Sequence, residues 1–235
     1  MAKKKRASYM TPGEQVAGTV LFVVYLAVLP LAARPIFTLA ERLLDTSFSA
    51  AQRSIIVYYL LFAVSVVIFH SFLARTCHTL TENLGGAVRT LGVGLVALYG
   101  LNELVYRLTY HLAGNRTNLN DTSVFAQLDT APHMTALIVV FLAPFVEEVL
   151  FRGLVFGCLK AKSRAAAYLI SCALFALLHV WQFAVGGGDL TYLVLMVQYL
   201  VPGAVLAWAY ERTGTLWTSI ALHAAANALS LWAAM

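Results

Sequence analysis

Residues 134–159 of the chain read MTALIVVFLAPFVEEVLFRGLVFGCL, and Glu147, Glu148 and Arg152 are the only charged side chains in this stretch. A helix that crosses the hydrocarbon core of a bilayer needs about 20 predominantly apolar residues. A charged side chain at that depth is costly, so the few that occur usually mark a functional site. The stretch therefore predicts a membrane-spanning helix that carries such a site.

The composition of the whole chain agrees with a membrane protein. Of its 235 residues, 60% are hydrophobic and 11% are charged, and the mean hydropathy is +0.77. A soluble domain is about 45–50% apolar and about 25% charged, so this chain has too little polar surface to enclose a water-soluble core. The apolar segments are residues 16–33, 55–73, 88–108, 134–159, 165–183, 190–210 and 216–233. They predict an all-α polytopic bundle of about seven transmembrane helices.

The longest polar connection, residues 111–130, divides the chain into two parts. We predict N-terminal membrane helices and an outer loop in residues 1–130, and a four-span core in residues 131–235. The basic residues at positions 3–6 precede the first span, which indicates a cytoplasmic N-terminus rather than a nucleic-acid partner. The small size and short loops of the chain suit a multi-pass protein of a prokaryotic cell membrane. Three arginines in the first outer segment run against this orientation: Arg34, Arg42 and Arg53.

The two adjacent glutamates of the central stretch point in different directions. Consecutive residues on a helix lie about 100° apart, so Glu147 and Glu148 do not share one role. Arg152 follows Glu148 by four residues, which is the spacing of an ion pair on one helix face. Glu147 then has no local partner, and a buried carboxylate without one is a candidate general base. The alternative is a purely structural network of all three side chains.

Two later apolar segments contain further polar side chains. His179 lies in the fifth segment, and His223 and Asn227 lie four residues apart on one face of the seventh, separated by alanines. A lone intramembrane histidine is often structural. Together with Glu147, however, these side chains supply the base and the hydrogen-bond donors that hydrolysis needs. Two histidines and a carboxylate also form a legitimate zinc ligand set, so zinc stays an alternative to a cofactor-free site.

Helix geometry adds one difficulty and one contact. At 1.5 Å per residue, Glu147 is roughly 20 Å from the outer end of its span and His179 roughly 20 Å from the inner end of the next. These depths do not match in a core about 30 Å thick. A kink at Pro144, three residues before Glu147, would bring them closer. Gly153 and Gly157 form a small-residue pair that lets a neighbouring helix approach.

Three motifs, each in its own apolar segment, resemble the signature of the CAAX protease and bacteriocin-processing family of intramembrane glutamic endopeptidases, also called the Abi family. They are Glu147-Glu148-x-x-x-Arg152, Phe175-x-x-x-His179 and His223-x-x-x-Asn227. The resemblance covers residues 131–235 and matches every motif position. The preceding helices carry no signature of the family.

The resemblance implies a role for each motif residue. Glu147 activates water, His179 holds and polarises that water, and His223 and Asn227 stabilise the oxyanion. The residues implied to support the site are Glu148, Arg152 and Phe175. The family further implies cleavage of a peptide or protein substrate at the membrane, of the CAAX type or in peptide processing, lipidated substrates included. A required metal is not implied.

Two other functions fit the same residues. A non-catalytic immunity or scaffold protein on this fold would keep the motifs for structure alone. A proton-coupled transporter would use intramembrane glutamate and histidine as an ion path. The chain shows no internal repeat of the kind many carriers have, which favours the protease over the transporter.

Overall fold

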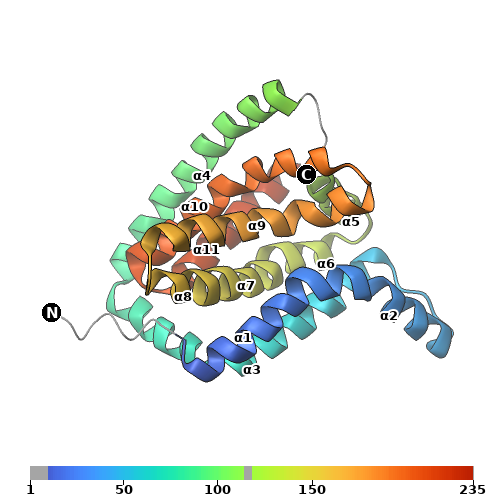
Figure 1. The fold of residues 1–235 in the computed structure, drawn as a ribbon, viewed down its shortest axis with the longest axis horizontal. Coiled ribbons are helices and arrows are strands. Elements are labelled where there is room, and N and C mark those ends of the chain that lie inside the picture. The colour runs from blue at the N-terminus through green and yellow to red at the C-terminus, as the bar shows by residue number, and fades with distance from the viewer. Residues whose placement is uncertain (1–9, 114–117, 235) are drawn as a thin grey trace.

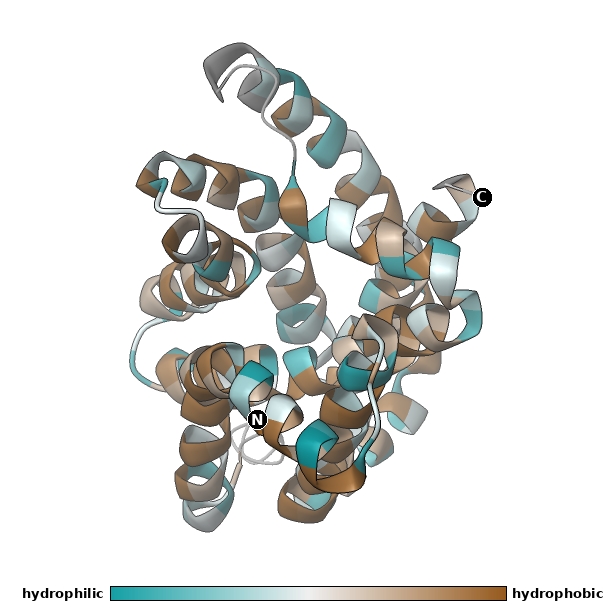
Figure 2. Cartoon of the chain, turned by 90° about the vertical axis from the view of Figure 1, so that its right-hand side faces the viewer, coloured by the Kyte–Doolittle hydropathy of each residue, from teal (hydrophilic) through white to brown (hydrophobic). Residues whose placement is uncertain are grey.

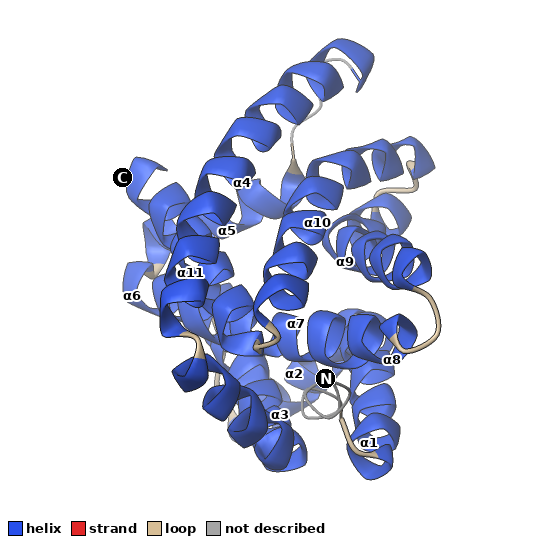
Figure 3. Ribbon diagram, turned by 90° about the vertical axis from the view of Figure 1, so that its left-hand side faces the viewer, coloured by secondary structure: helices blue, strands red, loops and turns tan. Residues whose placement is uncertain are grey.

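The computed structural model describes residues 10–113 and 118–234, which form helices and short connections without a strand (Figure 3). Six helical stretches in these ranges are long and apolar enough to cross a membrane. Hydrophobic residues run along most of the helices (Figure 2), and many large apolar side chains are exposed on the outside of the bundle. Helices satisfy their own backbone polar groups, as lipid requires. The prediction of an all-α polytopic membrane bundle is confirmed.

The seventh predicted span is also a helix, α11 (Leu216–Ala234), but it does not belong to those six. Ser219, His223 and Asn227 lower its mean hydropathy. The helix packs against the rest of the bundle on several sides, including α4 and α10. Polar side chains in a membrane helix are tolerated where they face other helices, and this placement explains the composition of α11.

The N-terminal part of the bundle consists of long helices. The chain runs without interruption through α1 (Pro12–Val23), the π-helical turn η1 (Val24–Val28) and α2 (Leu29–Leu44). Then follow α3 (Ala50–Glu82) and α4 (Leu84–Ala113). The first three predicted spans lie inside these helices, which extend beyond the predicted ends.

Side-chain caps start two of these helices. Thr11 and Glu14 form a capping box at the start of α1, and Ser49 and Gln52 form one at the start of α3. Each box satisfies backbone N–H groups that lack an intrahelical acceptor. The caps therefore define where the chain enters each of the two helices.

The three arginines that were expected in an outer loop lie on helices. Arg34 and Arg42 belong to α2, which continues to Leu44, and Arg53 lies in the first turn of α3. Arg53 pairs with Glu41 at 2.9 Å, which ties the two helices together across their connection. The basic residues at positions 3–6 lie outside the described part of the chain.

The predicted polar connection contains a further helix, α5 (Leu119–Thr130), so the expectation of a simple loop is wrong. Asn118 caps it by accepting hydrogen bonds from the amides of residues 120 and 121. The Asn118 amide group also donates to the Tyr199 hydroxyl at 2.8 Å, and the Leu119 amide donates to the Tyr192 hydroxyl at 2.6 Å. Docking onto these tyrosines stabilises a segment whose polar sequence alone indicates a loop.

The fourth span is one continuous helical stretch of alternating geometry. It comprises α6 (Pro132–Leu137), η2 (Ile138–Leu142), α7 (Ala143–Glu148), η3 (Val149–Phe156) and α8 (Gly157–Lys160), where η2 and η3 are π-helical. Within its most apolar window 61% of the residues are buried, against 17–39% in the other five spans. The stretch with three charged residues is therefore the centre of the bundle.

Prolines account for two of the π-helical turns. The Ala143 amide donates to the Ile138 carbonyl, five residues back, and Pro144 follows with no N–H to donate. The same arrangement recurs at η1, which is followed by Leu29 and then Pro30. Such π-turns are frequent at functional sites. The irregularity expected at Pro144 is present as a widened turn.

The remaining helices pack against this central stretch (Figure 1). They are α9 (Arg164–Gly186), the 3-10 turn η4 (Leu190–Leu195) and α10 (Met196–Thr213), followed by α11. Helix α10 packs between α9 and α4, and α11 packs against α3, α4, α7 and α10. The central stretch thereby contacts helices from both parts of the chain.

Gly153 permits one of these contacts. A Cβ atom at this position would lie 2.9 Å from Cε1 of Phe72 on α3 and 2.9 Å from the Met10 methyl group. Phe72 is fully buried and has little space to withdraw. Gly157 has only ordinary contacts, the nearest being 3.6 Å away. Close helix approach therefore depends on the first glycine of the predicted pair.

Candidate active site

The three motifs come together inside the bundle although they lie far apart in the sequence. Glu147 and Glu148 end α7, and the next turn, in η3, carries Arg152. Helix α9 packs against η3, and α11 packs against α7, η2 and η3. These contacts bring the motif residues of α9 and α11 to the glutamates, and the rings of Phe175 and His223 meet with centroids 5.9 Å apart.

Glu148 is fully buried and is the centre of a network of polar contacts. Its Oε1 atom lies 3.1 Å from Nη1 of Arg152 and 3.0 Å from Nδ1 of His223. Its second oxygen accepts a hydrogen bond from the Ser219 hydroxyl. The ion pair predicted from the i, i+4 spacing is present. The Arg152 cation and the Ser219 hydroxyl favour the ionised form of this carboxylate. An ionised carboxylate can only accept hydrogen bonds.

Arg152 joins three helices from its fully buried position. Besides Glu148, it contacts the carbonyl oxygen of Gly203 on α10, to which Nη2 donates at 3.1 Å. Its guanidinium carbon lies 4.3 Å from the ring centroid of Phe175 on α9, a cation–π contact. Removal of this side chain would leave Glu148 as a buried charge with one ionic partner fewer.

Glu147 is 5% exposed and lies near the other ring nitrogen of His223. Its Oε2 atom lies 4.0 Å from Nε2 of His223. Its Oε1 atom accepts a hydrogen bond from the Tyr25 hydroxyl at 3.1 Å, and the Tyr58 hydroxyl lies 3.2 Å from that of Tyr25. The expectation that Glu147 has no partner holds along its own helix but is wrong for the folded chain.

His179 lies beside the glutamates on α9. Its Nδ1 atom is 2.8 Å from the carbonyl oxygen of Phe175, one turn back. The imidazole stacks on the Tyr199 ring with a centroid separation of 4.3 Å and an interplanar angle of 22°. It interacts electrostatically with both Glu147 and His223. His179 therefore belongs to the same cluster, in a fixed orientation.

Asn227 lies one helical turn beyond His223, at the edge of the cluster. Its Nδ2 atom donates to the carbonyl oxygen of Val139 in η2 at 2.8 Å. In the i→i+5 pattern of η2, that carbonyl would accept from residue 144, which is a proline. The asparagine thus supplies the donor that the backbone lacks, and one N–H of its amide remains for another acceptor.

Three polar residues of this cluster were missed by the sequence analysis: Tyr25, Tyr58 and Ser219. Ser219 could have been found, because it lies four residues before His223 and shares the face of α11 that carries Asn227. The two tyrosines lie in apolar spans, where an aromatic ring with a polar tip is common. No local pattern connects them to Glu147, which is 122 residues from Tyr25.

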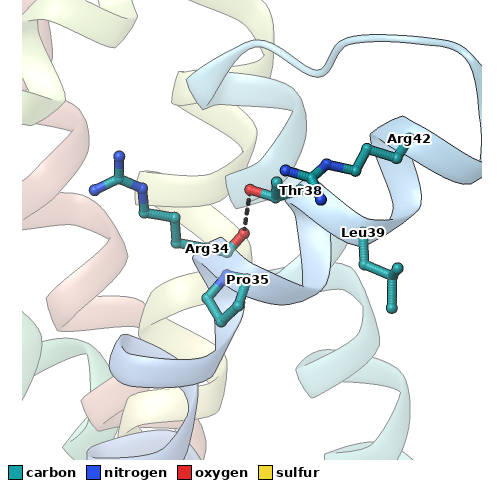
Figure 4. A pocket seen from close by; sticks show the side chains of 5 residues that line it. All are labelled: Arg34, Pro35, Thr38, Leu39 and Arg42. Carbon is teal, nitrogen blue, oxygen red and sulfur yellow. Dashed lines mark hydrogen bonds between the residues drawn. The ribbon is translucent and has the colours of Figure 1, made fainter.

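A separate concavity of about 420 Å³ lies on α2 (Figure 4). It is lined by Arg34, Pro35, Thr38, Leu39 and Arg42, and the Thr38 hydroxyl donates to the Arg34 carbonyl at 3.0 Å. All five residues come from one helix, and they include neither a carboxylate nor an imidazole. The buried cluster around Glu147 is therefore the better candidate for chemistry.

The fold and the cluster define a class of protein: an integral membrane protein with a carboxylate–imidazole site inside its helical bundle. Residues 129–229 match the model of the family described as type II CAAX prenyl endopeptidase Rce1-like. The match confirms the family resemblance of the three motifs. Tyr25 and Tyr58 lie outside the matched segment.

Two curated relatives agree with this family. The chain is 27% identical over 121 residues to "Putative membrane peptidase YdiL" of Bacillus subtilis (strain 168), which covers 51% of this chain and 45% of that protein. It is 33% identical over 86 residues to "UPF0177 protein YxdF" of Lactococcus lactis subsp. lactis (strain IL1403), which covers 37% of this chain and 42% of that protein. The chain thus spans less than half the length of these relatives. No solved structure matches it significantly.

Proposed function

We propose that the protein is an intramembrane endopeptidase in which Glu147 activates a water molecule for attack on a peptide bond. The placement of Glu147 Oε2 at 4.0 Å from His223 Nε2, inside the apolar bundle, carries this proposal. The separation is too long for a direct hydrogen bond, and one water that bonds to each atom at about 2.8 Å spans it. A base and an imidazole at one water are what general-base hydrolysis needs.

The hydrogen-bond partners of His223 and His179 indicate which ring nitrogen of each imidazole carries the proton. Glu148 accepts only, so Nδ1 of His223 carries the proton that lies between them, and Nε2 faces Glu147. The carbonyl oxygen of Phe175 likewise accepts only, so Nδ1 of His179 is an N–H. A neutral ring of this kind presents an Nε2 lone pair, so His179 can hold a water by accepting a hydrogen bond from it.

The same cluster of side chains also supplies hydrogen-bond donors for the oxyanion. If His223 takes a second proton from solvent at Nε2 before the attack, it becomes a donor there, and the carboxylate of Glu148, which is paired with Arg152, lies beside its Nδ1. The free N–H of Asn227 is a second donor one turn further along α11. We assign His223 and Asn227 to the oxyanion, His179 to the water, and Glu148, Arg152 and Phe175 to support of the site.

The proposed substrate is a peptide or protein held at the membrane and cut near its C-terminus or its membrane-proximal part. The family description, a CAAX prenyl endopeptidase, supports a substrate that carries a prenyl group. A prenyl chain would partition into the lipid that surrounds the bundle and bring the peptide to the depth of Glu147. Membrane lipid is therefore the second proposed partner, and no nucleic acid is proposed.

We further propose a prokaryotic cell membrane with the N-terminus in the cytoplasm. Both curated relatives come from bacteria, and the basic residues at positions 3–6 favour this orientation. Labelling of single cysteines introduced near position 3 and in the loop at Gly187, in intact cells, tests the orientation. Modification of the first site by an impermeant reagent would contradict it.

The test of hydrolysis uses the protein in lipid nanodiscs and internally quenched peptides that end in a CAAX-type sequence, with and without a farnesyl group. Glu147→Gln keeps the shape of the side chain but removes the base, and we expect cleavage to fall by about 10²–10⁴-fold. The matched control is Glu103→Gln, which changes an exposed glutamate paired with Arg107. Cleavage by Glu147→Gln at the wild-type rate would contradict the mechanism.

The same variants, reconstituted in sealed lipid vesicles and expressed in cells, separate the alternatives. Substrate uptake into vesicles that stops when the proton gradient is dissipated would favour the transporter. Biological activity that survives Glu147→Gln, with no peptide cleaved by either protein, would favour an immunity or scaffold role. Either result would replace the protease proposal.

A further inference from the structure

The hydroxyl groups of two tyrosines connect Glu147 to the N-terminal helices. Tyr25 on η1 is 6% exposed, and its hydroxyl lies 3.1 Å from Oε1 of Glu147. Tyr58 on α3 is half-buried, and its hydroxyl lies 3.2 Å from that of Tyr25. The two rings meet edge to face with centroids 6.3 Å apart. A helix from outside the family-matched segment thus contacts the proposed base directly through Tyr25, and a second one contacts Tyr25 through Tyr58.

The direction of these hydrogen bonds follows from the charge of Glu147. A tyrosine hydroxyl has one proton to donate and can accept in addition, whereas an ionised carboxylate only accepts. With Glu147 ionised, Tyr25 must donate to Oε1, and its oxygen is then free only to accept from Tyr58. The chain runs from Tyr58 through Tyr25 to Glu147. Each donor in such a chain strengthens the next.

This chain also distinguishes the two oxygens of the carboxylate. Oε1 is occupied by Tyr25, and Oε2 is the oxygen at 4.0 Å from Nε2 of His223. A hydrogen bond from the hydroxyl restricts rotation about the terminal bond of the Glu147 side chain. The lone pairs that would take a proton from water are thereby directed toward the imidazole.

We propose that Tyr25 is a positioning residue for the hydrolysis, and that Tyr58 acts through it. The inference rests on the proposed function and deepens it, because it makes the N-terminal helices part of the active site. The π-turn η1, which precedes Pro30, sets the place of Tyr25 on its helix. Other charged or titratable groups around Glu147 come from the remaining elements: Glu148 on α7, Arg152 on η3, His179 on α9 and His223 on α11.

The first arm of the test measures cleavage of the farnesylated quenched peptide in nanodiscs. Tyr25→Phe keeps the ring and removes the donor, and we expect kcat to fall about 10–100-fold with KM nearly unchanged. The acid limb of the rate–pH profile should move to higher pH, because the carboxylate loses a donor. Tyr58→Phe should cost less than about 10-fold. The matched control is Tyr59→Phe, an adjacent tyrosine on α3 whose side chain is 63% exposed.

The double variant shows whether Tyr58 acts through Tyr25. Once the Tyr25 hydroxyl is absent, Tyr58 has lost its route to Glu147, so Tyr58→Phe should add nothing in that background. Multiplicative effects on kcat, or a Tyr58→Phe effect larger than that of Tyr25→Phe, would overturn the chain. A Tyr25→Phe protein with the kinetics and pH profile of Tyr59→Phe would overturn the proposal.

The second arm does not require cleavage and so separates this inference from the proposed function. Thermal unfolding is measured for Tyr25→Phe, Glu147→Gln and the double variant. Either single variant removes the hydrogen bond between the hydroxyl and a charged carboxylate, so the two shifts in Tm should be clearly less than additive. Additive shifts would overturn the contact, whether or not any peptide is cleaved. Non-additive shifts without cleavage would keep the contact and remove the protease.

Discussion

The side-chain amide of Asn227 donates to the carbonyl oxygen of Val139 at 2.8 Å, across 88 residues of sequence. The backbone cannot satisfy this carbonyl in the pattern of η2, since the residue five positions later is Pro144. A motif residue and a proline of the central helix thus complement each other.

This relationship predicts a rescue. Asn227→Ala leaves a carbonyl unpaired and should lower the free energy of unfolding by about 1–3 kcal/mol. Pro144→Ala in the same protein restores an N–H to the helix, so the loss should shrink. Unfolding in detergent micelles measures both. An equal loss with and without Pro144→Ala would show that the amide does not replace a missing helical donor.

Cleavage should respond differently from stability to the same pair of changes. The second N–H of Asn227 is the proposed oxyanion donor. Asn227→Ala removes it whether residue 144 is proline or alanine. We therefore expect low activity toward the farnesylated peptide in both Asn227→Ala proteins. Recovery of cleavage together with stability would make Asn227 a structural residue only.

The buried ion pair of Glu148 and Arg152 predicts that loss of the arginine alone destabilises the protein more than loss of both charges. Arg152→Met leaves Glu148 as a charge without its cation and should cost about 3–5 kcal/mol of unfolding free energy. Adding Glu148→Gln removes the stranded charge, so part of that stability should return. Cleavage should stay low, because His223 has lost its anionic acceptor. A double variant less stable than Arg152→Met alone would contradict the pairing.

Gly153 predicts a steric effect of one methyl group. Gly153→Ala places a Cβ atom 2.9 Å from the buried Phe72 ring and should cost about 1–3 kcal/mol. The control is Gly100→Ala on α4, where nothing lies within 4 Å and alanine should be neutral or stabilising by up to about 1 kcal/mol. Equal unfolding free energies for the two variants would show that the packing of α3 against the central stretch does not require a glycine at position 153.

The protonation states proposed for the site predict a bell-shaped dependence of kcat on pH. Water activation needs the ionised Glu147 and fails when that group is protonated. Donation by Nε2 of His223 to the oxyanion fails when that ring is neutral. In Glu147→Gln, the acid limb should disappear from the residual activity. Circular dichroism over the same pH range checks that the protein stays folded. An unchanged acid limb would assign that limb to another group.

Zinc is the alternative that a chelator tests. Among the described residues, no three His, Cys, Asp or Glu side chains are grouped as metal ligands would be, and Nδ1 of His223 is directed at Glu148. We expect cleavage to persist after dialysis against EDTA, with no stoichiometric metal by elemental analysis. Loss of cleavage that returns on addition of zinc would assign the histidines to a metal.

The local features of this protein could be predicted from the sequence because each depends on neighbours along one helix. Apolar runs of about 20 residues define the spans. The four-residue spacing of Glu148 and Arg152 places them on one face, and the structure pairs them at 3.1 Å. The same reasoning fails for α5, whose polar sequence indicates a loop and which forms a helix by docking on Tyr192 and Tyr199.

The sequence by itself determined the membrane class, the spans and the three motifs, since periodicity and spacing act over a few residues. The tertiary structure alone decided which side chains surround Glu147. Tyr25 reaches it from 122 residues away, and Asn227 reaches η2 from 88 residues away. A buried carboxylate or carbonyl takes its partner from whichever helix packs against it, and helix packing joins residues that no local pattern connects.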